Sequence, residues 1–113
     1  MEKRKQVEVI KDDFRKAQSI LTVIGDETRQ LILLVLMNAD CKVGMRVGEI
    51  TEKTHLSRPA VSHQLKILKE AGLIGMREEG TKNFYYITLD EKMLLLKKLI
   101  VDIEGFMNKF IDK

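Results

Sequence analysis

The sequence has no tryptophan, one proline and one cysteine among its 113 residues. The lone cysteine, Cys41, cannot form an intrachain disulfide and matches no paired-cysteine zinc pattern, which excludes a disulfide-stapled secreted fold. The longest uninterrupted apolar run is Leu31 to Met37, far shorter than the roughly 20 residues that a membrane-spanning helix needs. Since no apolar export signal follows the charged amino end either, we expect a cytoplasmic protein.

The sequence also has little excess charge of either sign. Its 20 Lys and Arg residues are nearly balanced by 17 Asp and Glu residues, which leaves a net charge of +3. The whole excess lies in residues 42–84, which hold eight basic and five acidic side chains, while the segments on either side are neutral. A local basic zone weakly favours a nucleic acid partner, and a solvated surface is the alternative. A phosphate-binding glycine loop, a nucleophile beside a base and a carboxylate pair are all missing, so we do not expect an enzyme.

The spacing of apolar residues predicts one mainly α-helical domain over residues 1–113 with a small β-hairpin before the last helix. The first helix is expected at about residues 7–24. Asp26 then caps a second helix, which runs to about Met37 and whose nearly continuous apolar character predicts burial. Further helices are expected at about 47–53, 58–71 and 90–111, and two strands at about 73–79 and 83–88 flank a turn at Gly80. The predicted order is α-α-α-α-β-β-α.

The helix at residues 58–71 has the best-defined ends in the chain. The Ser57 hydroxyl is expected to accept a hydrogen bond from the Ala60 amide, and Pro59 falls in the first turn, where its missing N–H costs little. Gly72 suits a left-handed position after the helix, which brings Leu73 against Leu68 as in a Schellman motif. Both ends of this helix are therefore specified locally.

Two helices joined by a tight turn at residues 54–57, with a hairpin directly behind them, form a winged helix-turn-helix, with the helix-turn-helix at about 47–72 and the wing at about 73–88. A helical projection points His63 and Lys66 away from the core, with Arg58 and Ser62 beside them. Such side chains suit a DNA major groove: Arg58 for guanine or phosphate, Gln64 for adenine and Lys66 for phosphate.

Several motifs resemble the arsenic-repressor (ArsR-type) regulators over roughly residues 14–90. They are Ile24-Gly-Asp-Glu-Thr-Arg-Gln-Leu-Ile-Leu, Val47-Gly-Glu-Ile, Leu56-Ser-Arg-Pro-Ala-Val-Ser-His-Gln-Leu-Lys-Ile-Leu-Lys-Glu-Ala-Gly-Leu-Ile, Glu79-Gly and Tyr85-Tyr. The resemblance implies a homodimeric winged-helix repressor that binds an imperfect DNA palindrome and releases it when an inducer, often a soft metal ion, binds. Ser62 and His63 match the family's Ser-His pair, whereas Arg58 replaces a common glutamine and Gln64 a usual second histidine.

The wing departs from this pattern, because Glu78 and Glu79 dilute the charge of Arg77 and Lys82. We expect a modest contribution of the wing to DNA affinity, with Lys82 and Asn83 nearest the DNA backbone. The alternative function is a winged-helix module that binds proteins and has lost DNA binding.

The last helix carries an apolar arc of about 160°, whereas packing on a single core needs roughly 100°. The surplus predicts a dimer through the last and first helices, and a buried helix in a monomer is the alternative. A symmetric dimer sets two DNA-reading helices about 34 Å apart. The arc is formed by Leu95, Leu96, Leu99, Ile100, Ile103, Phe106, Met107, Phe110 and Ile111.

No cofactor or metal site is expected. Cys41 has no second cysteine, and His55 and His63 both belong to the helix-turn-helix. Asp102 and Glu104 on the last helix have no imidazole near them, and two carboxylates make a poor site for a soft metal. A redox or thiol-sensing role for Cys41 stays open, and the inducer stays unknown.

Overall fold

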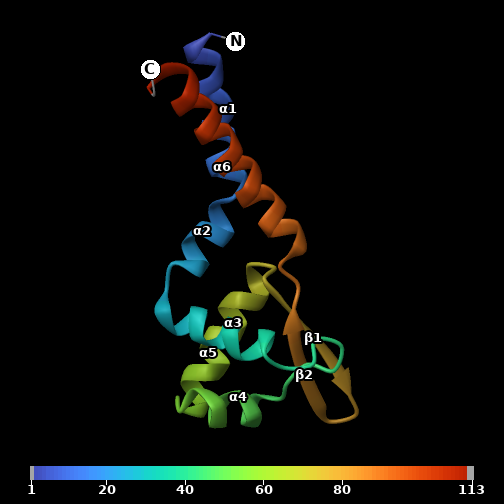
Figure 1. Ribbon diagram of the computed structural model, residues 1–113. Coiled ribbons are helices and arrows are strands. Elements are labelled where there is room, and N and C mark those ends of the chain that lie inside the picture. The colour runs from blue at the N-terminus through green and yellow to red at the C-terminus, as the bar shows by residue number, and fades with distance from the viewer. Residues whose placement is uncertain (1, 112–113) are drawn as a thin grey trace. The chain divides into compact units, whose positions relative to one another are not determined.

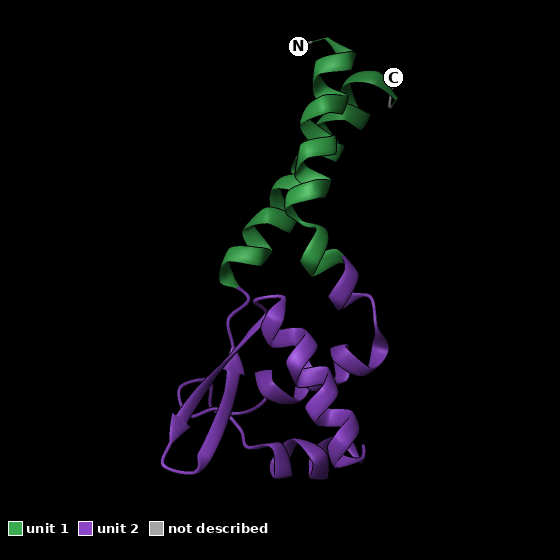
Figure 2. Ribbon diagram, turned by 180° about the vertical axis from the view of Figure 1, so that it is seen from behind, with its two compact units in different colours: residues 1–21, 90–113 green, residues 22–89 purple. Residues whose placement is uncertain are grey.

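The computed structural model describes residues 2–111 and shows two compact units (Figure 2). One unit, residues 2–21 and 90–111, contains α1 (Lys3–Lys16), the start of α2 (Gln18–Ile24) and α6 (Asp90–Phe110). The other, residues 22–89, contains α3 (Glu27–Met37), α4 (Val47–Thr54), α5 (Arg58–Glu70), β1 (Ile74–Glu79) and β2 (Lys82–Ile87) (Figure 1). The mainly helical winged fold with one hairpin before the last helix is therefore confirmed. No helix within residues 2–111 is long and apolar enough to cross a bilayer.

The predicted first helix is two helices, which is the one change in the element order. The chain leaves the helical conformation at Ala17, where φ is −91° and ψ is 6°, and α2 begins at the next residue. The Ala17 N–H still donates to the Asp13 carbonyl, and the Leu21 N–H donates to the Ala17 carbonyl. So short a break hardly changes the three- and four-residue spacing of the apolar residues. The apolar pattern therefore predicts one continuous helix and does not indicate the break.

The core of residues 22–89 is built from one face each of α3, α4 and α5 together with the start of β1. Its fully or almost fully buried apolar side chains are Ile32, Leu33, Leu36, Ile50, Val61, Leu65, Leu68, Leu73 and Ile74. The expected burial of α3 is right for one face only, because Leu34 is 61% exposed and Met37 49% exposed. A nearly continuous apolar run could not show that the helix has two different sides.

Both ends of α5 have the geometry that the sequence predicted. The Ser57 hydroxyl accepts from the Ala60 amide at 3.3 Å. At the other end Gly72 has a φ of 78°, and the Leu73 N–H donates to the Leu68 carbonyl at 3.0 Å, which completes the Schellman motif. The turn before α5 uses a second left-handed residue, His55, at φ 60°.

The wing is a two-stranded antiparallel hairpin that is fastened to the residues before α4. Ile74 lies opposite Ile87 and Glu79 opposite Lys82. The backbone of Met45 exchanges two hydrogen bonds of 2.8 Å with that of Tyr85 in β2. Gly44 makes this approach possible, because it has a φ of 82° and a Cβ there would lie 2.6 Å from the Tyr85 carbonyl oxygen.

In the unit that contains α1 and α6, a buried carboxylate joins these two helices. Asp13 on α1 is only 3% exposed, and its Oδ1 accepts from Lys98 Nζ at 3.0 Å. The same Lys98 Nζ donates to Asp102 Oδ2 at 2.7 Å, while no donor within residues 2–111 bonds the buried Asp13 Oδ2. Burial raises the pKa of the Asp13 carboxyl and the neighbouring Asp102 carboxyl raises it further, whereas Lys98 opposes the change.

Replacement of Asp13 by asparagine tests this account of the buried carboxyl. A group whose pKa is raised in the folded state loses its stabilising contribution as the pH rises through that pKa. The wild-type protein should therefore lose stability over this pH range, whereas Asp13→Asn, which has no carboxyl at this position, should not. The melting temperature of Asp13→Asn minus that of the wild type should therefore increase from about pH 4 to about pH 8, measured by circular dichroism.

Asp12→Asn is the matched control, because hydrogen bonds from Arg15 and then Lys16 lower the pKa of the exposed Asp12 carboxyl. Its melting-temperature difference should shift slightly in the opposite direction over the same pH range. Equal pH profiles for the two variants would contradict the assignment.

Candidate nucleic-acid interface

The outer face of α5 is the first part of the candidate interface. Val61, Leu65 and Leu68 are at most 1% exposed and fix the inner face. The side chains predicted to meet DNA, Arg58, Ser62, His63 and Lys66, are all exposed on the remaining surface of the helix. The projection made from the sequence therefore matches the exposure of these four side chains, since burial of one face sets the direction of the other.

Gln64 is engaged inside the protein. Its Oε1 accepts from Arg29 Nη1 at 3.0 Å, and Arg29 Nε donates to the Val23 carbonyl at 2.8 Å. The Arg29 backbone N–H is bonded to Asp26 Oδ1 at 3.0 Å. The paired hydrogen bonds of a glutamine to adenine use both the oxygen and the nitrogen of its amide. The bond from Arg29 takes one of the two lone pairs of the Gln64 oxygen and ties the amide to α3, so less of its hydrogen-bonding capacity is left for DNA. Arg29 was not among the predicted site residues, since no local spacing joins residues 29 and 64.

Arg77 on β1 is also engaged inside the protein. Its Nε donates to Glu79 Oε1 at 2.9 Å, and Nη1 and Nη2 donate to the Lys42 and Val43 carbonyls at 3.4 and 3.0 Å. The guanidinium also lies 5.0 Å from the centre of the Phe84 ring. Three of its five N–H donors are thus used, and two of these hold the loop before α4 against the hairpin.

Lys82 and Asn83, predicted to be the wing residues nearest the DNA backbone, are on opposite faces of the hairpin, because neighbouring residues of a strand alternate between faces. Lys82 is on the face of Glu79 and Arg77, and Asn83 is opposite Glu78 on the other face. Both side chains are exposed.

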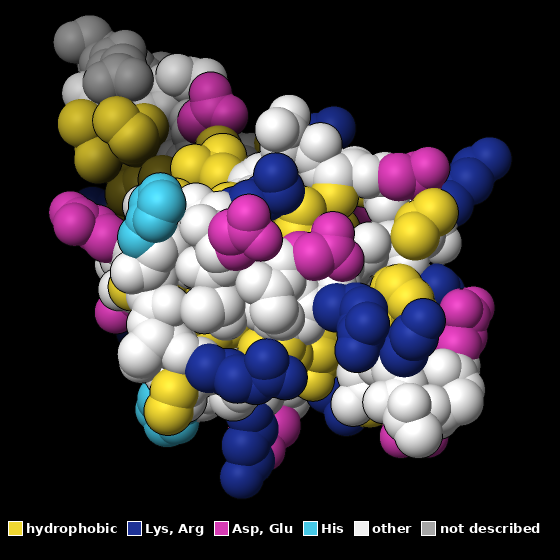
Figure 3. Space-filling view, turned by 90° about the horizontal axis from the view of Figure 1, so that it is seen from below, with side chains coloured by type: hydrophobic (Ala, Val, Ile, Leu, Met, Phe, Trp, Pro, Cys, Tyr) yellow, Lys and Arg dark blue, Asp and Glu magenta, His cyan; other side chains and the backbone are white. Residues whose placement is uncertain are grey.

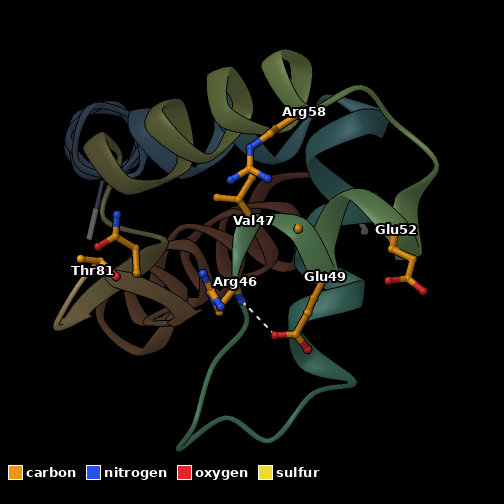
Figure 4. A pocket seen from close by; sticks show the side chains of 8 residues that line it. Arg46, Val47, Glu49, Glu52, Arg58 and Thr81 are labelled. Carbon is orange, nitrogen blue, oxygen red and sulfur yellow. Dashed lines mark hydrogen bonds between the residues drawn. The ribbon is translucent and has the colours of Figure 1, made fainter.

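A cleft of about 520 Å³ connects the start of α4, the start of α5 and the tip of the wing. Figure 4 shows the Arg58 side chain reaching from α5 toward Val47, with Arg46 close to the start of α4 and Thr81 on the wing side. Arg46 and Thr81 were not among the predicted site residues, because only the tertiary fold brings them to one cleft with Arg58 and Asn83. The lining residues are Arg46, Val47, Gly48, Glu49, Glu52, Arg58, Thr81 and Asn83.

The charges on this part of the surface are mixed. Figure 3 shows Lys and Arg side chains lying among Asp and Glu side chains rather than in one uninterrupted basic patch. The basic excess of residues 42–84 is thus spread out, and DNA binding depends on where individual cations point.

A separate apolar surface lies on α6. Leu94 is 67% exposed, Val101 53% and Ile100 49%, and together with Met93 and Leu96 they line a groove of about 460 Å³. Of the apolar arc predicted on this helix, only Leu99 is almost fully buried, at 2% exposed. This helix therefore offers apolar area to a partner.

Within residues 2–111, no three His, Cys, Asp or Glu side chains are grouped closely enough to hold a metal ion. Cys41 is an exposed free thiol, and His55 occupies the left-handed turn between α4 and α5.

A helix-turn-helix with an exposed second helix and an attached hairpin defines the class of winged helix-turn-helix DNA-binding regulators. Comparison with known proteins identifies the family. The model of the bacterial regulatory protein, arsR family, matches residues 26–75. An uncharacterized HTH-type transcriptional regulator of Methanocaldococcus jannaschii is 37% identical over 92 residues, which cover 81% of this chain and 99% of that protein. The chain belongs to the arsR family of transcriptional regulators.

Two further relatives are similar over most of their length. The transcriptional repressor SdpR of Bacillus subtilis is 34% identical over 95 residues, covering 84% of this chain and 92% of that protein. The solved homodimeric winged helix-turn-helix DNA-binding domain from Mycobacterium bovis has a TM-score of 0.57 and 25% identity, covering 92% of this chain and 89% of that one.

The contacts of Arg77 lead to a prediction about stability. Arg77→Gln removes the bonds to the two loop carbonyls and should lower the free energy of unfolding by about 1 kcal/mol. Lys82→Gln is the control on the neighbouring strand and should change it by less than about 0.5 kcal/mol. Urea unfolding followed by circular dichroism measures both, and equal effects would show that Arg77 does not hold the loop.

Proposed function

We propose that this protein is a sequence-specific DNA-binding repressor that binds a palindromic operator as a homodimer and releases it in response to an inducer. The observation that carries the proposal is the exposed face of α5, which presents Arg58, Ser62 and His63 within its first two turns. The first turns of the second helix are the part that enters the major groove in this class. The assignment of repression rests on the family resemblance and on the relative named as a repressor.

Each exposed residue has a stated role in this proposal. Ser62 and His63 hydrogen bond to base edges, and Arg58 and Lys66 contact guanine or phosphate. Lys82 and Asn83 contact the backbone on opposite sides of the wing.

Gln64 and Arg77 have smaller roles, because their contacts inside the protein limit them. Gln64 keeps its amide nitrogen and one lone pair of its oxygen for DNA, since the other lone pair accepts from Arg29. Arg77 keeps the wing in place and has two N–H groups left for a phosphate.

We infer that the dimer forms through residues 90–111 and about 7–24, while residues 47–72 and 73–88 serve DNA. The exposed apolar groove on α6 supports this, and so does the homodimeric state of the similar domain from Mycobacterium bovis. Burial of apolar area is the main driving force of such association. A second copy also gives two reading helices, as a palindrome requires.

The test of DNA reading begins with selection of bound duplexes from a random pool. Wild-type protein should enrich a palindromic sequence, with affinity that falls steeply as salt is added, because neutralised phosphates release counterions. The double variant Ser62→Ala, His63→Ala should lose roughly tenfold or more of the preference for that sequence over random DNA, as base contacts are worth about 1–3 kcal/mol each.

Lys69→Ala is the matched control, because Lys69 is an exposed residue in the last turn of the same helix. It should leave the sequence preference unchanged. If wild-type protein binds no duplex at any salt concentration, the protein-interaction module becomes the better account. If the selected site lies in a promoter that the protein activates, the assignment of repression is wrong.

The dimer has its own test. Ile100 on α6 and Val43 in the loop before α4 are both apolar and both 49% exposed. Ile100→Glu should convert the wild-type dimer to a monomer in sedimentation equilibrium at micromolar concentration, and Val43→Glu should not. A wild-type monomer, or an Ile100→Glu dimer, would be the contrary result.

A further inference from the structure

We propose that the cleft between α4, α5 and the wing tip is a seat for one DNA backbone phosphate, held by Arg46 and Arg58. This inference rests on the proposed function and deepens it. Arg46 was not among the residues that the sequence suggested. Asn83 and Thr81 line the wing side of the same cleft and offer further N–H and O–H donors.

The fold places Arg46 there by backbone contacts. Met45, the residue before it, is bonded at both its N–H and its carbonyl to Tyr85 of β2. This pairing holds the residues before α4 beside β2, the strand that carries Asn83. Arg46 and Asn83 both line the cleft, although they are 37 residues apart in the sequence.

Arg58 approaches the same place from α5. A Cβ on Gly48 would lie 4.0 Å from Arg58 Nη1, so the guanidinium is above the first turn of α4. Figure 4 shows this direction of the side chain. The position favours phosphate over guanine as the partner of Arg58, which the sequence had left open.

Neither guanidinium has a hydrogen bond or an ion pair with a side chain or carbonyl of residues 2–111 (Figure 4). Arginine carries five donors in a planar fork that suits the oxygens of a phosphate. Two exposed guanidinium groups at one cleft, with no acid bonded to either, match a phosphodiester that arrives with bound DNA.

Two carboxylates, those of Glu49 and Glu52, also line the cleft. Glu49 Oε1 accepts from the Arg46 backbone N–H at 3.3 Å and so caps α4. Glu52 has no such role. It opposes an anion in the cleft and weakens binding, because like charges repel.

The test is the salt dependence of binding to the duplex selected above, measured by fluorescence anisotropy. Removal of one phosphate contact lowers the slope of log affinity against log salt by about 0.9, so Arg46→Gln should lower it by about 1 for each bound protomer. Arg46→Lys keeps the charge and should retain most of the slope. Glu52→Gln should tighten binding.

Lys53→Gln is the matched control, since Lys53 is exposed on α4 next to Glu52 but does not line the cleft. It should leave the slope near the wild-type value. Thermal unfolding of every variant checks that the fold is intact.

Duplexes with one neutral methylphosphonate at successive backbone positions locate the phosphate. One position in each half-site should weaken wild-type binding and have no further effect on Arg46→Gln, because contacts between the same two groups are not additive. If free phosphate is the true ligand instead, inorganic phosphate should displace DNA from the wild-type protein at constant ionic strength. The same concentration should displace less DNA from Arg46→Gln.

The outcomes separate this inference from the proposed function. If wild-type protein does not bind DNA, the proposed function fails. If wild-type protein binds with a steep salt dependence but Arg46→Gln has the same slope, or if inorganic phosphate displaces the DNA, only the backbone-phosphate seat is wrong.

Discussion

Burial of one face of α5 is the constraint on which the rest of the interface depends. Val61, Leu65 and Leu68 are packed into the core, and Ser57 and Gly72 fix where the helix begins and ends. A helix with a fixed inner face and fixed ends has no freedom to rotate or slide, so its exposed side chains have fixed directions. Base recognition requires side chains placed in this way, because hydrogen bonds tolerate little error in direction.

Counting charges gives a poor measure of what this surface can bind. Arg77 has the sequence context of a wing cation, yet it holds the loop at residues 42–43. Arg46 lies just outside the Val47-Gly-Glu-Ile motif, yet it lines the cleft beside the wing. The difference arises because a guanidinium bonded to internal carbonyls has fewer donors for DNA, whereas an exposed one keeps all five. The number of basic residues therefore does not show which of them are available to DNA, because their internal contacts decide this.

Much of the fold could be predicted because its signals are local. Caps at Asp26 and Ser57, the glycine after α5, the hairpin turn at Gly80 and the inner face of α5 each follow from a few neighbouring residues, and each is present in the structure. The break at Ala17 could not be predicted, because a break that does not shift the spacing leaves the apolar pattern intact. The exposed side of α3 could not be predicted either, because a continuous apolar run has no polar face that marks the solvent side.

The sequence by itself determined the class of fold, the family resemblance and the exposure of Arg58, Ser62, His63 and Lys66, because helical periodicity and capping operate within about one turn. Only the tertiary structure decided that Gln64 is bonded to Arg29, that Lys82 and Asn83 lie on opposite faces, and that Arg46 meets Arg58 at a cleft. These relations join residues from different elements. Their geometry is set by the packing of α3, α4, α5 and the hairpin around a shared core, which no local pattern records.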